Sequence, residues 1–310
     1  MAAAVDMARA ALGPVGVCLP VSFTGTPHVD LQREAARRLE HAGYQAVWTN
    51  EVIGKDAFVQ LGVLAAATER MVFGTYVANI WARPAQTMHA AAAQLAQAYP
   101  GRVVAGLGVG YPEQAASTGR EFGAPLVTMR DYVTGMDSPT WPPAPDELYP
   151  RLIAANGPKM LALAGEIADG AMPAGLPAKF TAQAREVLGP DKLLVVGLSI
   201  IPDADPDRAK AAARESVSGR LGAPSYAARM AELGYTAREI ADVDDRLVDA
   251  LVAHGDAATI AAKVREHLHA GADHVTLLLP IGGEFATGIH QLEQLAPALA
   301  LRRVGVDAGG

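Results

Sequence analysis

Short, continuous apolar runs alternate with amphipathic segments along almost the whole chain, and this alternation constrains the fold more than any other feature. Continuous apolar runs are typical of parallel strands that are covered on both faces. Strands are expected at 15–20, 44–49, 71–77, 102–108, 152–155, about 171–172, 193–201 and 273–280. Eight such strands, each followed by helical sequence, predict an α/β fold of the (β/α)₈ TIM-barrel type. A doubly wound open sheet is the alternative.

The segments between the strands carry helical periodicity. Helices are expected at 29–43, 57–69, 84–99, 157–168 and 287–301. The stretch 205–269 is interpreted as helical with glycine breaks, which places a helical insertion at roughly 205–255, after the seventh strand. Residues 135–150 contain five prolines and no periodicity, which indicates an extended connection. A chain of 310 residues fits one barrel domain, so a single domain over 1–310 is expected.

Composition excludes several classes of function. The net charge is −7 without a basic stripe, which argues against a nucleic-acid partner. No apolar run approaches 18 residues, so no membrane span is expected. The one cysteine, Cys18, allows no disulfide within the chain, and no spacing of His, Cys, Asp or Glu indicates a metal site. A cytoplasmic protein is the default expectation.

In a (β/α)₈ barrel, the residues that follow the strands form the functional face. Glu51 follows the second expected strand, where it either contacts a ligand or pairs with Arg83. The stretch GLGVG (106–110) includes the end of the fourth strand and is followed directly by Tyr111. Its glycines allow close approach of a ligand, although glycines also serve turns and tight packing. These positions are therefore candidates for a binding site.

The segment NGPKM (156–160) lies between an expected strand and an expected helix. Gly157 can expose backbone N–H groups at the helix start, and Lys159 adds a positive charge, which together suit a phosphate group. In the alternative interpretation, Asn156 only caps the helix and Lys159 is solvated.

The sequence lacks the common motifs of hydrolases and of enzymes that form a Schiff base with lysine. There is no HExxH, no GxSxG, and no lysine inside an expected strand. The histidines form no catalytic set, and His274, at the start of the last strand, is interpreted as a core residue with satisfied hydrogen bonds. A hydrolase or a Schiff-base aldolase is disfavoured. The pattern favours a site that holds a cofactor and lets the cofactor react.

Five segments resemble one known family in the same order along the chain. They are AGYQAVWTNEVIGKDAF (42–58), AAATERMVFGTYVANIWARPA (65–85), YPGRVVAGLGVG (99–110), AANGPKMLALAGEIADGAMP (154–173) and AGADHVTLLLP (270–280). Together they resemble the luciferase-like monooxygenase superfamily, and within it the oxidoreductases that depend on the deazaflavin coenzyme F420. The resemblance covers nearly the whole chain, and no single motif is diagnostic.

The resemblance implies a TIM barrel that binds its deazaflavin at the C-terminal mouth. It also implies a non-prolyl cis peptide in the third strand, which here matches the bond Tyr76–Val77. Ala78 and Asn79 would then face the cofactor. The residues implied beside the ring or its ribityl chain are Gly106, Leu107, Gly108, Val109 and Gly110. Those implied near the phosphate-bearing tail are Asn156, Gly157, Pro158, Lys159 and Met160.

The function that the resemblance implies is F420-dependent hydride transfer to or from a small organic substrate. One alternative is an FMN-dependent monooxygenase of the same fold, and another is a non-catalytic relative that binds a flavin or deazaflavin. Glu51 and Tyr111 are the candidates for proton handling, Tyr111 as a hydrogen-bond donor. Glu51 could instead hold the cofactor. Members of the family often dimerise through helices near the second and third strands, so a homodimer is expected.

Three departures from the family pattern qualify this expectation. Members that act on glucose 6-phosphate have a histidine where Glu51 stands and a glutamate where Tyr111 stands, which argues against that reaction. Arg83 is followed directly by Pro84, whereas many members have a histidine between them. The region 123–150, which often walls the substrate pocket, is shorter than is usual in the family.

Overall fold

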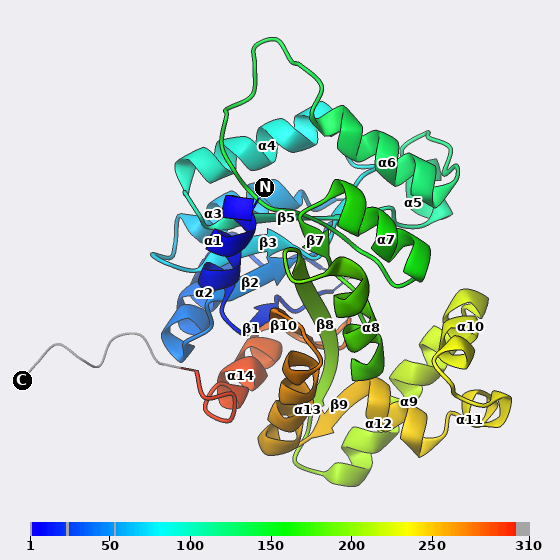
Figure 1. Cartoon of the computed structure of the whole chain (residues 1–310). Coiled ribbons are helices and arrows are strands. Elements are labelled where there is room, and N and C mark those ends of the chain that lie inside the picture. Colours follow the sequence, from blue (N-terminus) through cyan, green and yellow to red (C-terminus); the bar gives the residue numbers. More distant parts are fainter. Residues whose placement is uncertain (1, 23–24, 53, 302–310) are drawn as a thin grey trace, which may run out of the picture.

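Eight parallel strands form a closed barrel in the computed structural model, which describes residues 2–22, 25–52 and 54–301 (Figure 1). The barrel strands are β1 (Val15–Cys18), β2 (Ala46–Thr49), β3 (Val72–Thr75), β5 (Val103–Gly108), β6 (Arg151–Ile153), β7 (Gly170–Ala171), β8 (Leu193–Pro202) and β10 (His274–Leu278). The last strand, β10, pairs with both β1 and β8 and so closes the barrel. The predicted (β/α)₈ barrel is confirmed, and the open doubly wound sheet is wrong because such a sheet keeps two free edges.

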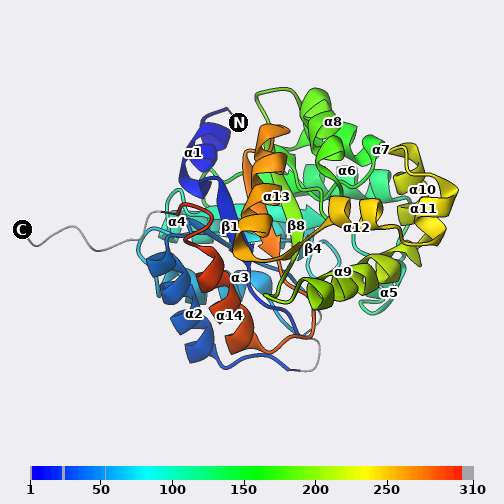
Figure 2. The same ribbon diagram turned by 90° about the horizontal axis from the view of Figure 1, so that it is seen from below.

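Helices surround the barrel, as Figure 2 shows from below. They are α2 (Val29–Ala42), α3 (Ala57–Ala65), α4 (Ala85–Ala98), α5 (Pro112–Ala116), α6 (Pro125–Met136), α7 (Pro158–Ile167), α8 (Ala178–Leu188), α13 (Ala257–His269) and α14 (Phe285–Leu295). The five helices predicted from periodicity are present, with ends that differ by up to six residues, the largest difference being at the end of α14. The extended connection predicted at 135–150 begins two residues late, because α6 continues to Met136.

Apolar side chains form two separate clusters, one inside the barrel and one between the barrel and its helices. Alternation along β8 shows the division, because Leu193 and Val195 belong to the inner cluster while Leu194 and Val196 belong to the outer one. Successive residues of a strand point to opposite faces, so a continuously apolar strand is required to serve both clusters. This accounts for the sequence pattern from which the barrel was predicted.

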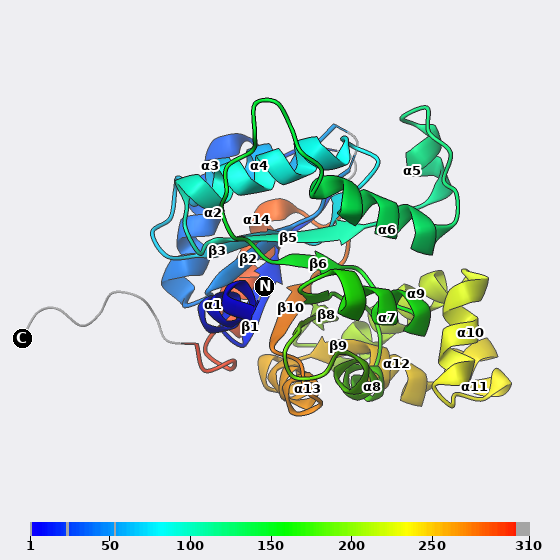
Figure 3. The same ribbon diagram turned by 45° about the horizontal axis from the view of Figure 1, so that its top comes forward.

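A helical insertion follows β8, as predicted, and lies on one side of the barrel (Figure 3). Its helices are α9 (Pro206–Leu221), α10 (Pro224–Glu232), α11 (Ala237–Ala241) and α12 (Asp245–Leu251). The prediction of helix across 205–269 is wrong at β9 (Val252–Gly255). This short strand pairs in parallel with the C-terminal part of β8, from Ser199 opposite Val252 to Pro202 opposite Gly255. Val252 and Ala253 are buried there, so packing on β8 outweighs local helix propensity.

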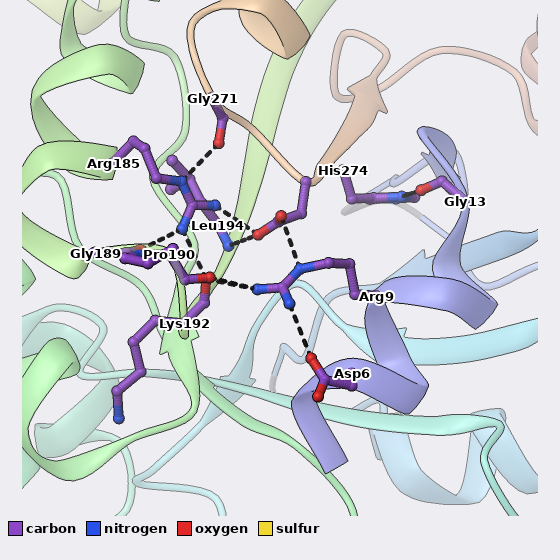
Figure 4. A network of polar contacts seen from close by, with 11 residues as sticks. Asp6, Arg9, Gly13, Arg185, Gly189, Pro190, Lys192, Leu194, Gly271 and His274 are labelled. Carbon is purple, nitrogen blue, oxygen red and sulfur yellow. Dashed lines mark hydrogen bonds and ion pairs between the residues drawn. The ribbon is translucent and has the colours of Figure 1, made fainter. Parts of the chain in front are cut away.

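The first helix, α1 (Ala2–Leu12), is absent from the elements predicted above. Its side chains Val5, Ala8 and Leu12 join the inner apolar cluster, so α1 covers the N-terminal end of the barrel. Figure 4 shows the polar contacts that hold it there. Arg9 donates to the carboxylate of Asp273 at 3.0 Å and to the carbonyl oxygen of Pro190 at 2.9 Å.

Asp273 joins three elements at this end of the barrel. Besides Arg9, its carboxylate accepts hydrogen bonds from Arg185 Nη2 at 2.6 Å and from the backbone N–H of Leu194 at 2.8 Å. These partners lie on α1, α8 and β8, and Asp273 itself directly precedes β10. The N-terminal face of a (β/α)₈ barrel serves stability rather than catalysis. We therefore assign this network to the scaffold.

His274 lies beside this network and points into the barrel. Its Nδ1 is 2.7 Å from the carbonyl oxygen of Gly13, and its Nε2 is 3.0 Å from Trp48 Nε1. A carbonyl can only accept and an indole N–H can only donate, so the ring is neutral with its proton on Nδ1. Burial lowers the pKa of His274 to about 4. The interpretation of His274 as a satisfied core residue is confirmed.

Candidate active site

The third barrel strand is interrupted at the mouth of the barrel. It continues after Tyr76 and Val77 as β4 (Ala78–Asn79), and the bond Tyr76–Val77 is cis, as the resemblance implied. The N–H of Tyr76 donates to the carbonyl oxygen of Thr49 at 2.6 Å, and that of Glu51 donates to the carbonyl oxygen of Val77 at 3.1 Å. On the other side, β4 pairs with β5, with Ala78 opposite Leu107 and Asn79 opposite Gly108. The segment is thus braced from both sides.

Four residues of this segment differ in their exposure. Tyr76 and Val77 are partly exposed, whereas Ala78 and Asn79 are buried. The Tyr76 ring packs edge-on against Trp48 inside the barrel, and its hydroxyl donates to the carbonyl oxygen of Pro173 at 2.8 Å. Burial raises the pKa of Tyr76, so its hydroxyl stays a donor. Val77 thus leaves an apolar side chain partly accessible at the mouth.

Glu51 and Arg83 meet in a buried ion pair beside this segment. Arg83 donates from Nη1 to Glu51 Oε2 at 3.1 Å and from Nη2 to Glu51 Oε1. Glu51 also accepts the backbone N–H of Ala57 at 3.1 Å and that of Asn79 at 2.9 Å. Of the two alternatives given for Glu51, the pairing with Arg83 is therefore present. A carboxylate offers about four acceptor positions, and all of them are used here.

Asp56 extends the ion pair towards solvent. Its carboxylate accepts from Arg83 Nη2 at 2.8 Å and from the N–H of Val59, the third residue of α3, at 3.0 Å. Partial burial of Asp56 raises its pKa, but these two donors outweigh that effect, so the net pKa is lowered. The ionised carboxyl thereby both caps α3 and supports Arg83.

The side chains of Asn79 and Trp81 turn inwards. Asn79 Oδ1 accepts the backbone N–H of Trp81 at 3.0 Å. The indole N–H of Trp81 donates to the carbonyl oxygen of Val109 at 2.7 Å, and its ring packs against Phe122. These contacts tie the end of β4 to the segment that follows β5.

The glycines of GLGVG are required by close packing. A Cβ on Gly106 would lie 2.2 Å from the carbonyl oxygen of Thr75, and one on Gly108 would lie 2.3 Å from a methyl group of Val77. Gly110 has φ +60°, and a Cβ there would meet the side chain of Gln114. Leu107, between them, is fully buried in the outer cluster. The glycines thus bring β5 directly against the braced segment. Tight packing of these glycines is compatible with a ligand that lies beside them.

Tyr111 lies at the same edge of the barrel, directly after this stretch. It precedes α5, and its side chain is 70% exposed, so its hydroxyl is open to an incoming molecule. Its backbone N–H donates to Gln114 Oε1 at 3.0 Å, which holds the loop in place.

The segment NGPKM leaves the start of α7 open. Gly157 is the N-cap of α7 and provides no side-chain hydrogen bond to the helix. Asn156 does not cap the helix, because its Oδ1 accepts the N–H of Ala174, after β7, at 2.9 Å. Pro158 and Lys159 are exposed, and Met160 is half-buried. Pro158 has no N–H, so the donors of this first turn that can receive an anion are the backbone N–H groups of Lys159 and Met160.

The insertion brings side chains to this part of the mouth that were absent from the sequence-based candidates. Arg220 of α9 lies against Gly175, Arg229 of α10 lies against Gly157, and the Tyr226 hydroxyl donates to the carbonyl oxygen of Gly175 at 2.5 Å. These residues follow NGPKM by sixty or more positions. Nothing in the sequence indicates which charged residues of a polar helix face the barrel.

Lys55 is a further polar group at the mouth. Its ammonium donates to Asn50 Oδ1 at 2.7 Å and to Thr49 Oγ1 at 3.0 Å, at the end of β2. Burial lowers the pKa of Lys55, and the neighbouring Cys18 and Glu51 oppose this effect. Cys18 is itself buried, which raises its pKa to about 12.

Two other features bear on the type of site. Within the described residues, no three His, Cys, Asp or Glu side chains lie close enough together to hold a metal ion. The same part of the chain contains no helix that is long and apolar enough to cross a membrane.

The structure thus defines a closed (β/α)₈ barrel with a braced, glycine-lined segment at the strand ends, and in this class of fold the functional site lies at the C-terminal mouth. The sequence profile of the family described as luciferase-like monooxygenase matches residues 14–274. The chain belongs to this family.

Individual relatives cover only part of the chain. A protein of Mycobacterium tuberculosis that carries the name of a coenzyme F420-dependent oxidoreductase is 28% identical over 187 residues, which are 50% of this chain and 54% of that protein. The chain thus matches about half the length of this curated relative.

Solved structures share the fold over nearly the whole chain. The coenzyme F420-dependent tetrahydromethanopterin reductase of Methanopyrus kandleri has a TM-score of 0.69 at 18% identity, over 92% of this chain and 99% of that one. The oxygenating constituent of 3,6-diketocamphane monooxygenase from Pseudomonas putida, in complex with FMN, has a TM-score of 0.68 at 16% identity, over 94% and 100%. At these identities, the likeness shows the fold alone.

Proposed function

We propose that the protein is an F420-dependent oxidoreductase that transfers a hydride between the deazaflavin and a small organic substrate. The observation that carries the proposal is the segment Tyr76–Asn79, which β2 and β5 hold at the mouth with Val77 accessible. The flat face of a deazaflavin ring suits an apolar side chain beside a glycine edge. The name of the mycobacterial relative supports the deazaflavin over FMN.

The chain offers one group of residues for each part of the cofactor. The ring would lie along Tyr76, Val77, Ala78 and Asn79, with the backbone of Gly106–Gly110 beside it. The phosphate-bearing tail would lie at Asn156–Met160, where the open N-terminus of α7 suits an anion. When bound, the deazaflavin supplies a hydride from its C5 or accepts one there. The residues named here bind it and orient it.

Glu51 and Tyr111 have different places in this proposal. The four hydrogen bonds to Glu51 favour a positioning role, in which it fixes Arg83 and the N–H of Asn79, over proton transfer. The exposed hydroxyl of Tyr111 is proposed to donate a hydrogen bond to the substrate. A phenol hydroxyl can donate as well as accept a hydrogen bond, which suits this role.

FMN-dependent monooxygenation is the second candidate. The FMN-bound Pseudomonas putida structure shares the fold with a similar TM-score, which is the specific observation in its favour. The two candidates differ in their need for oxygen, because reduced FMN activates oxygen whereas the deazaflavin mainly passes a hydride.

An anaerobic turnover assay separates the candidates. Purified protein is mixed with reduced F420 and a panel of enones, ketones and imines, and the absorbance of the oxidised deazaflavin is followed. We expect its return with at least one acceptor and without oxygen. Turnover only with reduced FMN and oxygen would contradict the proposal. Tight F420 binding without turnover of any acceptor would favour the non-catalytic alternative.

We also propose that the chain folds as one domain and forms a homodimer through α3 and α4. The Ala-rich α4 allows close packing, and Val59 of α3 is 68% exposed. Sedimentation velocity would give a dimer mass, and Val59→Glu would shift it towards the monomer. A monomer at all concentrations would contradict this proposal. The cytoplasmic location stays a prediction.

A further inference from the structure

Arg220 of α9 is held at the barrel mouth by neutral groups. Its Nη2 donates to Ser199 Oγ at 2.7 Å and to Ser216 Oγ at 3.2 Å. Its Nη1 lies 2.5 Å from the position of a Cβ on Gly175, after β7. Within the described part of the chain, no carboxylate lies within ion-pair distance of Arg220. Its guanidinium charge is therefore fixed in position without being neutralised.

Arg229 of α10 faces the positive end of a helix. Its Nη2 lies 3.0 Å from the position of a Cβ on Gly157, which is the N-cap of α7. A helix N-terminus carries about half a positive charge, so a cation placed there is unfavourable unless an anion lies between the two. The pairing of Nη1 with Glu232 on its own helix offsets part of this effect. The nitrogen that faces α7 keeps donor capacity.

The other cations at the start of the insertion differ from these two. Arg208 pairs with Asp203, whereas Lys210 and Arg214 share Asp245. Their charges thus belong to surface ion pairs away from the two glycines. Arg229 is ion-paired too, with Glu232, so Arg220 and Arg229 differ from these cations in their place beside Gly175 and Gly157, after β7 and β6.

We propose that Arg220 and Arg229 bind the anionic tail of the cofactor. The affinity of the protein for the cofactor would then depend on the presence of that tail. The inference rests on the proposed function and names residues of the same site. Two guanidinium groups, at the ends of neighbouring strands, suit an elongated tail that carries a phosphodiester and carboxylates. Guanidinium groups form strong charge-assisted hydrogen bonds with both. Because Gly157 and Gly175 have no Cβ, the guanidinium groups of Arg229 and Arg220 can lie directly against them.

Binding of a tailed and a tail-less form of the same ring tests the proposal. The probes are F420 and its precursor deazariboflavin, which lacks the phosphate and everything beyond it, and bound ligand is measured by deazaflavin fluorescence. The variants are Arg220→Met and Arg229→Met, which remove the charge but keep much of the volume. Arg208→Met is the matched control, because it removes the same charge from the same insertion. Arg220→Lys keeps the charge and loses the planar fork.

We expect each methionine variant at 220 or 229 to weaken F420 binding by about tenfold or more, the loss of one charge-assisted hydrogen bond. Binding of deazariboflavin should change by less than about twofold, which also reports that the variant is folded. Arg208→Met should leave both affinities unchanged, and Arg220→Lys should give an intermediate loss. Equal weakening of both probes, or no difference from Arg208→Met, would overturn the proposal.

A second pair of probes separates this inference from the proposed function. If the wild-type protein binds FMN but not F420, the proposed function fails, and the same variants are tested with FMN and riboflavin. Selective loss of FMN would still support an anion site at Arg220 and Arg229. The inference would be overturned if the wild-type protein bound F420 no more tightly than deazariboflavin and FMN no more tightly than riboflavin.

Discussion

Glu51 and Arg83 form a buried, two-pronged ion pair that joins the end of β2 to the segment after β4. The side chain of Glu51 is 2% exposed and that of Arg83 is 10% exposed. The pair also fixes the N–H groups of Ala57 and Asn79, so it links α3 to the braced segment at the mouth. Its main effect is geometric, because it sets the path of the chain beside the proposed ring site.

Glu51→Gln should reduce both stability and cofactor affinity. The substitution keeps the shape but leaves Arg83 with only the partly exposed Asp56 as a charged partner. Removing one member of a buried pair costs about 3 kcal/mol or more. Urea unfolding measures the loss, and F420 titration should show weaker binding with a smaller change in turnover. A large fall in turnover at full F420 saturation would instead indicate proton transfer by Glu51.

The double variant Glu51→Gln, Arg83→Met is the control for this pair. It removes the uncompensated cation, so it should be more stable than Glu51→Gln alone. If the loss of stability in the double variant equals the sum of the losses in Glu51→Gln and in Arg83→Met, the contact between the two side chains contributes little.

Gly106→Ala and Gly108→Ala should separate folding from binding. The Cβ at 106 would meet the backbone oxygen of Thr75, which cannot move without distorting the barrel, so a loss of about 1–3 kcal/mol is expected. The Cβ at 108 would meet only a methyl group of Val77, which can shift towards the mouth. Thermal unfolding should show the larger effect for 106, and F420 titration the larger loss for 108. The reverse order would place the ring elsewhere.

Stability should fall as the pH is lowered from about 6.5 to about 4. Burial lowers the pKa of His274 to about 4, and the Gly13 carbonyl and the Asp273 carboxylate oppose this only in part. Between these pH values the unfolded chain binds a proton that the folded chain does not, so folding weakens as the pH falls. The difference between 6.5 and about 4 corresponds to about 3 kcal/mol. Urea unfolding across this pH range measures the effect.

His267 contributes in the same direction, since burial lowers its pKa to about 4 as well. His274→Gln keeps a donor and an acceptor but does not titrate. Its stability should therefore depend less steeply on pH than that of the wild type, with the His267 contribution remaining. An unchanged slope would show that His274 is not the neutral histidine described above.

Asp273→Asn should destabilise the scaffold without affecting the mouth. The carboxylate accepts from Arg9, Arg185 and Leu194, and an amide can replace only part of these contacts. We expect a loss of about 1–3 kcal/mol in the free energy of unfolding. F420 affinity, measured where the variant is folded, should match the wild type. A change in F420 affinity would show that this network also affects the structure of the barrel mouth.

The barrel could be predicted from the sequence because its strands are buried on both faces and so are continuously apolar. The same pattern located Glu51, GLGVG and NGPKM at strand ends, and the resemblance added Tyr76–Asn79. The structure places all four at the C-terminal ends of the barrel strands. The pairing of Glu51 with Arg83 was one of two alternatives, and it could be proposed because both residues follow neighbouring strands.

Other elements depend on contacts that no local pattern reveals. The strand β9 lies between helices α12 and α13 and pairs with the C-terminal part of β8, a contact between segments about fifty residues apart. Helix α1 is fixed by packing under the barrel and by Arg9, whose partners Asp273 and Pro190 lie more than 180 residues away. The directions of Arg220 and Arg229 follow from how α9 and α10 dock, which periodicity does not define.

A crystal structure of the protein grown with F420 tests the central claim most directly. We predict the deazaflavin ring along Tyr76–Asn79 and the backbone of Gly106–Gly110, with the tail at the start of α7. F420 bound at another surface, or a mouth that takes up FMN and excludes F420, would contradict the account.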